Sequence, residues 1–238
     1  MIELAPDAVH VWTAPLNVDE HAFDEMLARL SPSERKRAGA LLEERAVRQT
    51  VVSRAMQRQL LASYVGGHPS DISFGVVAMG KPTLSRPNDI GLTFNTTHSG
   101  ELVIIAVTAN RDVGVDVEKV RPVRRALRVA KRVYSAQEYE MLAALPPDKV
   151  DHAFLSIWVR REGTAKARGD SVWRGLASWK NGEIENSSLR HDYRVEYLDL
   201  GPSFVGVVVA RGDDWRVEMK GTFSPSGSSG SDQHGVTE

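Results

Sequence analysis

Hydrophobic and polar positions follow two different spacings along this chain, and the spacing changes several times. Positions 9–12, Val-His-Val-Trp, alternate as in a half-buried strand, and the apolar residues of positions 23–30 then recur at helical spacing. Ser31 is followed by a proline and then by a glutamate at the third helical position, which is the pattern of a capping box. The sequence therefore predicts a strand, a helix, and a long helical region from Ser31 to about Tyr64, which a pair of glycines ends.

The middle of the chain predicts a set of short strands. Runs of apolar and β-branched residues are separated there by Gly, Pro, Asn and Asp, and the runs are too close together to leave room for helices between all of them. This spacing favours antiparallel pairing. The runs lie at 72–77, 92–97, 102–108 and 113–118.

The last part of the chain predicts two helices and three strands. Ser135 opens a second capping-box pattern, and a pair of prolines ends that helix. A further helix is expected from about Asp148 to Arg168, before Gly169. Strand-like runs follow at 193–200, 204–210 and 215–219. The Gly/Ser-rich residues from Ser224 onward are expected to be disordered.

Strands and helices occur in a similar order in the two halves of the chain, with a break near residue 110. This order predicts an α+β protein made of two similar α/β halves, although the sequence itself reveals no repeat. We expect an N-terminal half at 1–110, a C-terminal half at 111–220 and a tail at 221–238.

Composition narrows the class of protein. The 238 residues are 42% hydrophobic, enough for a substantial core, and 30 basic residues nearly cancel 31 acidic ones. The summed charge therefore gives no long-range reason to expect nucleic acid or an anionic membrane. With no cysteine the chain has no disulfide and no thiolate chemistry, and no apolar run approaches the roughly 20 residues that span a bilayer. We expect a cytoplasmic protein, neither secreted nor membrane-spanning.

The strand predicted at 113–118 carries two carboxylates on one face. Side chains alternate across a strand, so the valines of this run share one face while Asp116 and Glu118 share the other. A solvated acidic strand edge is the simplest interpretation of such a pair taken alone. A third carboxylate elsewhere in the fold would favour a site.

The helix predicted from about Asp148 offers that third carboxylate. Trp158, Glu162 and Lys166 lie four residues apart and therefore on one face. Glu162 and Lys166 could form an ordinary surface pair, but the large apolar body of Trp158 favours a position at the rim of a cleft. Three carboxylates and a lysine suit a magnesium and phosphate site, because Mg²⁺ prefers oxygen ligands.

Other segments carry weaker evidence. The run 94–100 brings hydroxyls and His98 into a strand and turn that could bind phosphate, although a capped loop fits equally well. No second histidine lies at ligand spacing from His98, which argues against zinc. A basic segment could meet an acidic protein, bind nucleic acid or be solvated, and the sequence leaves all three open. This basic segment comprises Arg121, Arg124, Arg125, Arg128, Lys131 and Arg132.

Taken in order, several of these pieces resemble the Sfp-type 4'-phosphopantetheinyl transferases. The resemblance covers roughly residues 8–210, including a segment at 131–138. The motifs in this order along the chain are more specific to the family than any one of them alone. The pieces are Gly80-Lys81-Pro82, the run 94–99, the run 114–118, and Trp158 to Glu162 with Lys166.

The resemblance implies a fold and a set of residue roles. The family is a pseudo-dimer of two similar α/β halves, with coenzyme A bound between them. Asp116, Glu118 and Glu162 are implied as ligands of Mg²⁺, Glu162 as the base for the carrier serine, and Lys166 as the cation that steadies the departing phosphate. Contacts to coenzyme A are implied for Arg37, Arg48, Lys81, Pro82, Thr97, His98 and Lys166.

The implied function is transfer of the 4'-phosphopantetheine arm of coenzyme A to a serine of an apo acyl or peptidyl carrier protein, with release of adenosine 3',5'-bisphosphate. We expect a monomer that contacts an acidic carrier helix through the basic segment. Two helix residues depart from the family pattern: Arg161 stands where lysine is frequent, and Gly163 stands where alanine or serine is usual. Asp170-Ser171 also replaces the glycine-rich ending often seen after the lysine. Gly163 and this altered ending motivate the alternative of a non-catalytic module that binds coenzyme A or a carrier. A nucleic-acid binder is the other alternative, which the near-zero charge disfavours.

Overall fold

The computed structural model describes residues 1–76, 81–170 and 192–223. Its strands are β1 (Ala8–Pro15), β2 (Ser73–Val76), β3 (Pro82–Arg86), β4 (Leu92–Ser99), β5 (Leu102–Ala109), β6 (Val113–Lys119), β7 (Tyr193–Leu198), β8 (Phe204–Arg211) and β9 (Arg216–Thr222). Its helices are α1 (Glu20–Arg29), α2 (Pro32–Gly39), α3 (Glu44–Val65), α4 (Ala126–Val133), α5 (Ala136–Ala143) and α6 (Pro147–Arg168), with a single 3₁₀ turn, η1 (Pro69–Asp71). This mixture of separate helices and sheets is the α+β class that the sequence predicts.

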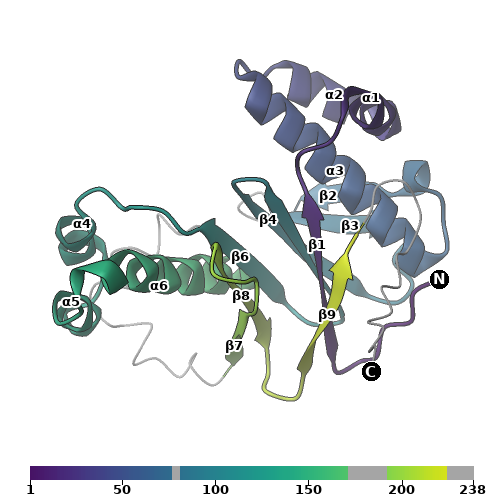
Figure 1. Ribbon diagram of the computed structural model, residues 1–238. Coiled ribbons are helices and arrows are strands. Elements are labelled where there is room, and N and C mark those ends of the chain that lie inside the picture. Colours follow the sequence, from purple (N-terminus) through teal and green to yellow (C-terminus); the bar gives the residue numbers. More distant parts are fainter. Residues whose placement is uncertain (77–80, 171–191, 224–238) are drawn as a thin grey trace, which may run out of the picture.

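Two sheets pack face to face, each with a long helix on its outer side. The first sheet has the order β4-β5-β1-β9 and the second β6-β8-β7, while β2 and β3 form a separate hairpin. Val9 and Val11 of β1 meet the valines of β6 in the core between the sheets. On the outer faces, α3 covers the first sheet and α6 covers the second (Figure 1). The alternation of apolar residues in each central strand therefore serves two cores at once.

The last described strand returns to the first sheet. β9 pairs in parallel with β1, with Val217 opposite Val9, so the last described strand lies beside the first strand (Figure 1). A buried network joins them: His10 Nε2 lies 3.1 Å from Glu218 Oε2, and His10 Nδ1 lies 2.7 Å from the Tyr64 hydroxyl. That hydroxyl also accepts from Trp12 Nε1 at 2.8 Å. Glu218 thereby ties β9 to both β1 and α3.

Most of the predicted elements are confirmed, one prediction is wrong, and two elements were not predicted. The expected long helix from Ser31 to Tyr64 is two helices, because α2 ends at Gly39 and the extended backbone of Glu43 precedes α3. Strand β3, which a proline opens and which pairs with β2, was not expected. Helix α4 was not expected as a separate element, since its N-cap Arg125 is left-handed (φ 61°) and makes no side-chain cap. The predicted tail from Ser224 lies outside the described residues.

Candidate active site

The edge of β6 that faces away from β8 is lined by side chains of β4. Asn95 Oδ1 accepts a hydrogen bond from the backbone N–H of Val115 at 2.9 Å, and Ser99 Oγ accepts one from Lys119 N–H at 3.0 Å. Alternate β4 residues thus take the place of a neighbouring strand, which satisfies N–H groups that an open sheet edge would leave without partners. We call this contact between the two sheets the β4–β6 seam, made by Asn95, Thr97 and Ser99 on β4 against β6.

Both carboxylates of β6 point into the β4–β6 seam. Thr97 Oγ1 donates to Asp116 Oδ1 at 2.9 Å, and Ser99 Oγ donates to Glu118 Oε2 at 3.0 Å. Asp116 is only 3% exposed, and its second oxygen, Oδ2, is buried without a hydrogen-bond partner in the described part of the chain. The alternation of the strand therefore brings the two carboxylates onto one face, as predicted, and that face meets α6 and side chains of β4.

Helix α6 brings Glu162 and Lys166 to the same place. Lys166 Nζ lies 2.6 Å from Asp116 Oδ1 and 3.7 Å from Glu162 Oε2, and it also donates to Thr97 Oγ1 at 3.2 Å. The side chains of Glu162 and Lys166 are 24% and 27% exposed. Both side chains are therefore partly exposed, and a ligand in solvent can reach them, while Asp116 beside them is buried.

Crowding of the carboxylates perturbs their acidity. Burial, followed by the charge of Asp116, raises the pKa of Glu162 to about 7. Burial also raises the pKa of Glu118, against the opposing hydrogen bond from Ser99. Each raised pKa reflects the unfavourable free energy of placing another negative charge in this confined space. A cation bound there would lower that free energy.

The donor set of this site fits a hard divalent cation. All the acidic side chains supply oxygen, and Asp116 Oδ2 is a buried carboxylate oxygen whose hydrogen-bonding capacity no described residue uses. The carboxylates are not gathered around one point: within the described ranges no three His, Asp or Glu side chains converge as a preformed metal site. Asp116 and Glu162 adjoin each other, while Glu118 is held two residues along β6.

The other predicted site residues lie at different distances from this centre. Lys81 Nζ donates to the carbonyl of Val113 at 2.8 Å, at the start of β6, and burial lowers its pKa. His98 is exposed at the end of β4, and loss of hydration, then the charges of Lys166 and Arg45, lower its pKa. Pro82 opens β3 opposite Val76.

Two predicted arginines do not reach the carboxylates. Arg48 donates to Glu20 at 2.7 Å and to the carbonyl of Val18 at 2.7 Å, and its guanidinium stacks on Phe23. Arg37 is exposed near the end of α2. Neither shares a hydrogen bond with Asp116 or Glu162 in the described structure.

The structure also shows site residues that sequence reasoning missed. Arg45, exposed in the first turn of α3, is close enough to His98 for its charge to act on the imidazole. Asn95 and Ser99 flank the predicted Thr97 at a spacing of two, so the strand period alone could have placed all three on one face. Arg45 lies one helical turn before Arg48, and nothing in the sequence distinguishes the two.

Comparisons with known proteins show the family of this chain. Residues 112–210 match the model of the 4'-phosphopantetheinyl transferase superfamily, and residues 15–110 match the N-terminal domain of a 4'-phosphopantetheinyl transferase. The chain is similar to the 4'-phosphopantetheinyl transferase HetI of Nostoc, with 34% identity over 90% of this chain and 92% of the relative. The chain belongs to the 4'-phosphopantetheinyl transferase superfamily. It is also similar to a 4'-phosphopantetheinyl transferase (32% identity over 69% of this chain and 70% of the relative) and to Sfp (28%, with the same coverage), both from Bacillus subtilis.

Gly163, one departure from the pattern of this transferase family, has a packing reason. A Cβ built on Gly163 would lie 2.9 Å from a methyl group of Val207 and 3.1 Å from one of Val209. A Cβ on Gly114 would lie 2.1 Å from the carbonyl oxygen of Gly163. The facing glycines let α6 approach β6 and β8 closely, which offsets the cost of about 1 kcal/mol for a glycine inside a helix.

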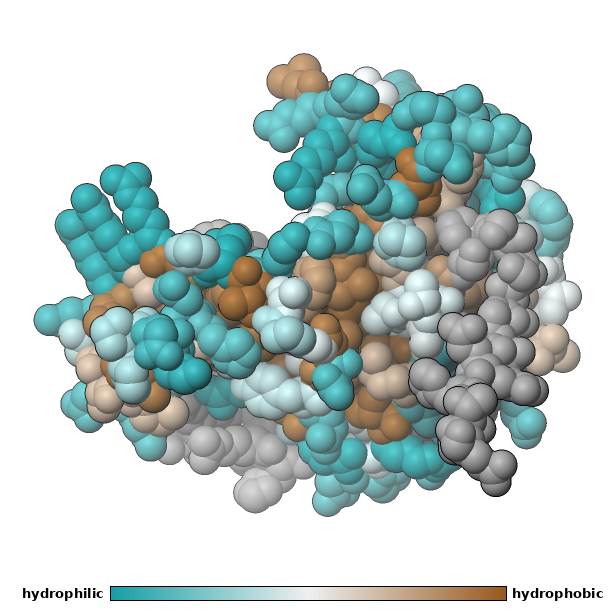
Figure 2. All heavy atoms as spheres, in the orientation of Figure 1, coloured by the Kyte–Doolittle hydropathy of each residue, from teal (hydrophilic) through white to brown (hydrophobic). Residues whose placement is uncertain are grey.

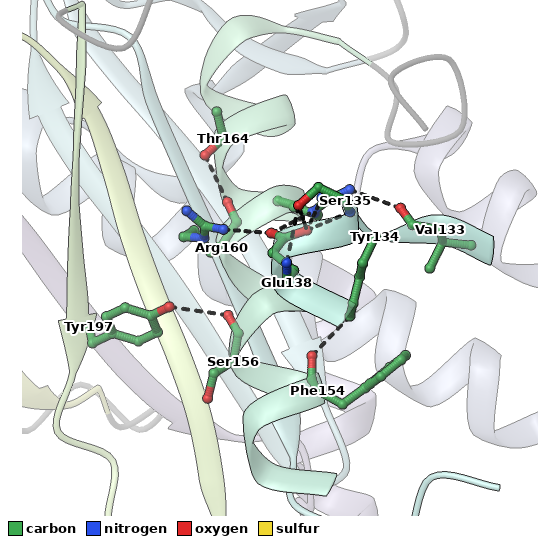
Figure 3. Close-up of polar contacts among 10 residues, drawn as sticks. Val133, Tyr134, Ser135, Glu138, Phe154, Ser156, Arg160, Thr164 and Tyr197 are labelled. Atoms are coloured by element: carbon green, nitrogen blue, oxygen red, sulfur yellow. Dashed lines mark hydrogen bonds and ion pairs between the residues drawn. The ribbon is translucent and has the colours of Figure 1, made fainter. Parts of the chain in front are cut away.

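Arg161, the other departure from the transferase pattern, is a buried structural cation. Its guanidinium donates to both carboxylate oxygens of Glu138, donates to the carbonyl of Val133 at 3.0 Å, and lies over the ring of Tyr134. Arg160 donates to the same Glu138 at 2.7 Å, and Figure 3 shows Glu138 of α5 between Arg160 and Ser135, the N-cap residue of α5. A planar guanidinium can make this set of bonds, which a lysine could not. The cluster fixes α5 against α6 immediately beside Glu162.

No helix in the described ranges is long and apolar enough to cross a membrane.

Proposed function

We propose that this transferase moves the 4'-phosphopantetheine arm of coenzyme A to a serine of an acyl or peptidyl carrier protein, with Mg²⁺ bound by Asp116, Glu118 and Glu162. The observation that supports this most is the buried Oδ2 of Asp116, which has no hydrogen-bond partner among the described residues and lies next to the partly exposed Lys166 and Glu162. The names of the relatives support the transfer itself.

The chemistry is a phosphoryl transfer to a hydroxyl group. The serine oxygen bonds to the phosphorus that carries the pantetheine arm, the bond from that phosphorus to the bridging pyrophosphate oxygen breaks, and adenosine 3',5'-bisphosphate leaves with the bond's electrons. Bound Mg²⁺ would supply neutralisation of charge on the pyrophosphate. Glu162 accepts the serine proton, directly or through water, and Lys166 steadies the departing phosphate and can protonate it.

Side chains of the N-terminal half are proposed to hold the phosphates of coenzyme A. Lys81, Thr97 and His98 lie along β4 and the start of β6, and Arg45 lies within electrostatic reach of His98. We add Arg45 to the cations expected from the sequence, because Arg48 already pairs with Glu20. Arg37 remains a candidate for the 3'-phosphate, and Pro82 for contact with adenine.

The carrier protein is proposed to dock on the basic segment. The surface in Figure 2 is hollowed between the block that α1, α2 and α3 form and the block that contains α4 and α5. Arg128 and Lys131 of α4, with Arg124 and Arg125 just before it, are exposed on the second block. An acidic helix there would meet a complementary charge.

We expect Arg128→Glu to raise the KM for the carrier by about tenfold while the KM for coenzyme A stays constant. Lys149→Glu, an exposed charge reversal at the start of α6, is the matched control.

The test of the proposed reaction is intact mass spectrometry of purified apo carrier proteins incubated with the full chain and coenzyme A. A gain of the mass of the arm that requires Mg²⁺, disappears with chelator and is lost in Glu162→Gln supports the proposal. Retention of coenzyme A by the protein without a mass gain on any carrier would favour the non-catalytic module instead. A gain that persists unchanged in Glu162→Gln would remove Glu162 from the chemistry.

A further inference from the structure

The hydroxyl of Ser99 bridges two groups of β6. Its oxygen accepts the backbone N–H of Lys119 at 3.0 Å, and its proton is donated to Glu118 Oε2 at 3.0 Å. A serine hydroxyl has one proton and two lone pairs, so a backbone bond that anchors the oxygen also limits the directions in which the proton can point. The side chain of Glu118 is therefore held by a group that is itself held by the strand.

A second contact between a β4 hydroxyl and a β6 carboxylate lies two residues earlier. Thr97 Oγ1 donates to Asp116 Oδ1 at 2.9 Å and leaves Oδ2 without a partner among the described residues. In Glu118 the hydroxyl of Ser99 and the more distant Arg121 Nη2, at 3.6 Å, both approach Oε2. In each carboxylate one oxygen is thus engaged by a β4 hydroxyl, and the other carries no such bond.

We propose that Ser99 is a positioning residue that fixes the orientation of Glu118 for cation binding. The inference rests on the proposed function, since it takes Glu118 as a ligand of the divalent cation. A hydrogen bond to one oxygen restricts rotation of the carboxylate, so that less freedom is lost when the other oxygen binds the ion. Because Ser99 belongs to the N-terminal half and Glu118 to the C-terminal half, the seam between the two sheets also orients this ligand.

A purely structural role is the competing explanation, because Ser99 also satisfies the N–H of Lys119. Asn95 separates the two roles: it caps the N–H of Val115 in the same seam but is not bonded to either carboxylate of β6. Replacing Asn95 should lower stability without changing the affinity for the cation.

The experiment measures Mn²⁺ binding to the full chain with coenzyme A present, from the electron paramagnetic resonance signal of free Mn²⁺. Mn²⁺ is used because it shares the oxygen-ligand octahedral preference of Mg²⁺. Ser99→Thr keeps the hydroxyl, and Ser99→Val carries a methyl group in its place, so the pair differs in the two contacts of that hydroxyl, to Glu118 and to the N–H of Lys119. We expect Ser99→Val to weaken Mn²⁺ binding by about tenfold or more, and Ser99→Thr to remain close to the parent chain.

Thermal unfolding of each variant confirms that the fold is retained, and Asn95→Ala reports the effect of losing a seam contact alone. Equal Mn²⁺ affinities for Ser99→Val and Ser99→Thr would overturn the inference, as would an equal loss in Asn95→Ala. Glu118→Gln identifies which claim has failed. If Glu118→Gln weakens binding while Ser99→Val does not, only the positioning role is wrong. If Glu118→Gln leaves the affinity unchanged, the proposed ligand set is wrong and the inference falls with it.

Discussion

Replacing Gly114 with alanine tests how closely helix α6 must approach β6. The added Cβ would lie 2.1 Å from the carbonyl oxygen of Gly163 and 2.4 Å from the backbone nitrogen of Ala167. Ordinary van der Waals contact needs about 3.5 Å, so the helix would have to retreat by about 1.4 Å. Both obstacles are backbone atoms of α6, which cannot change rotamer to make room. Overpacking of this kind costs about 3 kcal/mol, the upper part of its usual range.

The same movement would affect the site, because Lys166 reaches Asp116 from α6 across 2.6 Å. We therefore expect Gly114→Ala to lower the free energy of unfolding by about 3 kcal/mol and to reduce the transfer rate. Urea unfolding followed by circular dichroism measures the first quantity, and carrier modification measures the second.

Two other glycines provide graded controls. Gly39→Ala adds a Cβ with nothing within 4 Å and should leave stability unchanged or slightly higher. Gly163→Ala meets only valine methyl groups, so a helix-propensity gain of about 1 kcal/mol opposes its overpacking cost. It should fall between the other two variants. If Gly114→Ala is as stable as Gly39→Ala, the close approach of α6 and β6 is refuted.

Two further predictions concern buried charges away from the carboxylates. Glu138→Ala should destabilise the chain by about 3–5 kcal/mol, because Arg161 would be left as a buried cation without its carboxylate; urea unfolding checks this, and a loss below about 1 kcal/mol would contradict it. Burial and the charge of Lys220 lower the pKa of His10, so below about pH 6.5 the unfolded chain binds more protons than the folded one. The free energy of unfolding should therefore fall as the pH decreases from 7.5 to 5.5, and this fall should be smaller in His10→Gln. Equal pH dependence in the two chains would show that His10 is not the group responsible.

The strand and helix periods were sufficient to place the central acidic residues. Alternation along 113–118 put Asp116 and Glu118 on one face, and the four-residue spacing put Glu162 and Lys166 on another. Which side chains share a face depends only on the local geometry of a strand or a helix, so it is the same in any fold that contains the two elements. That the two faces meet was an expectation from the family resemblance alone.

The features that could not be predicted from the sequence depend on contacts between segments that lie far apart along the chain. The parallel pairing of β9 with β1 joins the two ends of the chain, and no local pattern specifies such a partner. The choice between Arg45 and Arg48 depends on the packing of α3 against α1, where Phe23 and Glu20 engage Arg48. The role of Ser99 likewise follows only from the β4–β6 seam, in which side chains replace the backbone ladder of a regular sheet.

The most direct measurement of the central proposal is the location of the cation. Crystals of the full chain grown with coenzyme A and Mn²⁺ would show the ion by its anomalous scattering. The account predicts a peak next to the pyrophosphate, coordinated by Asp116 Oδ2 and by carboxylate oxygens of Glu118 and Glu162. A peak bound by other side chains, or coenzyme A bound in the cleft with no ion beside Asp116, would contradict it.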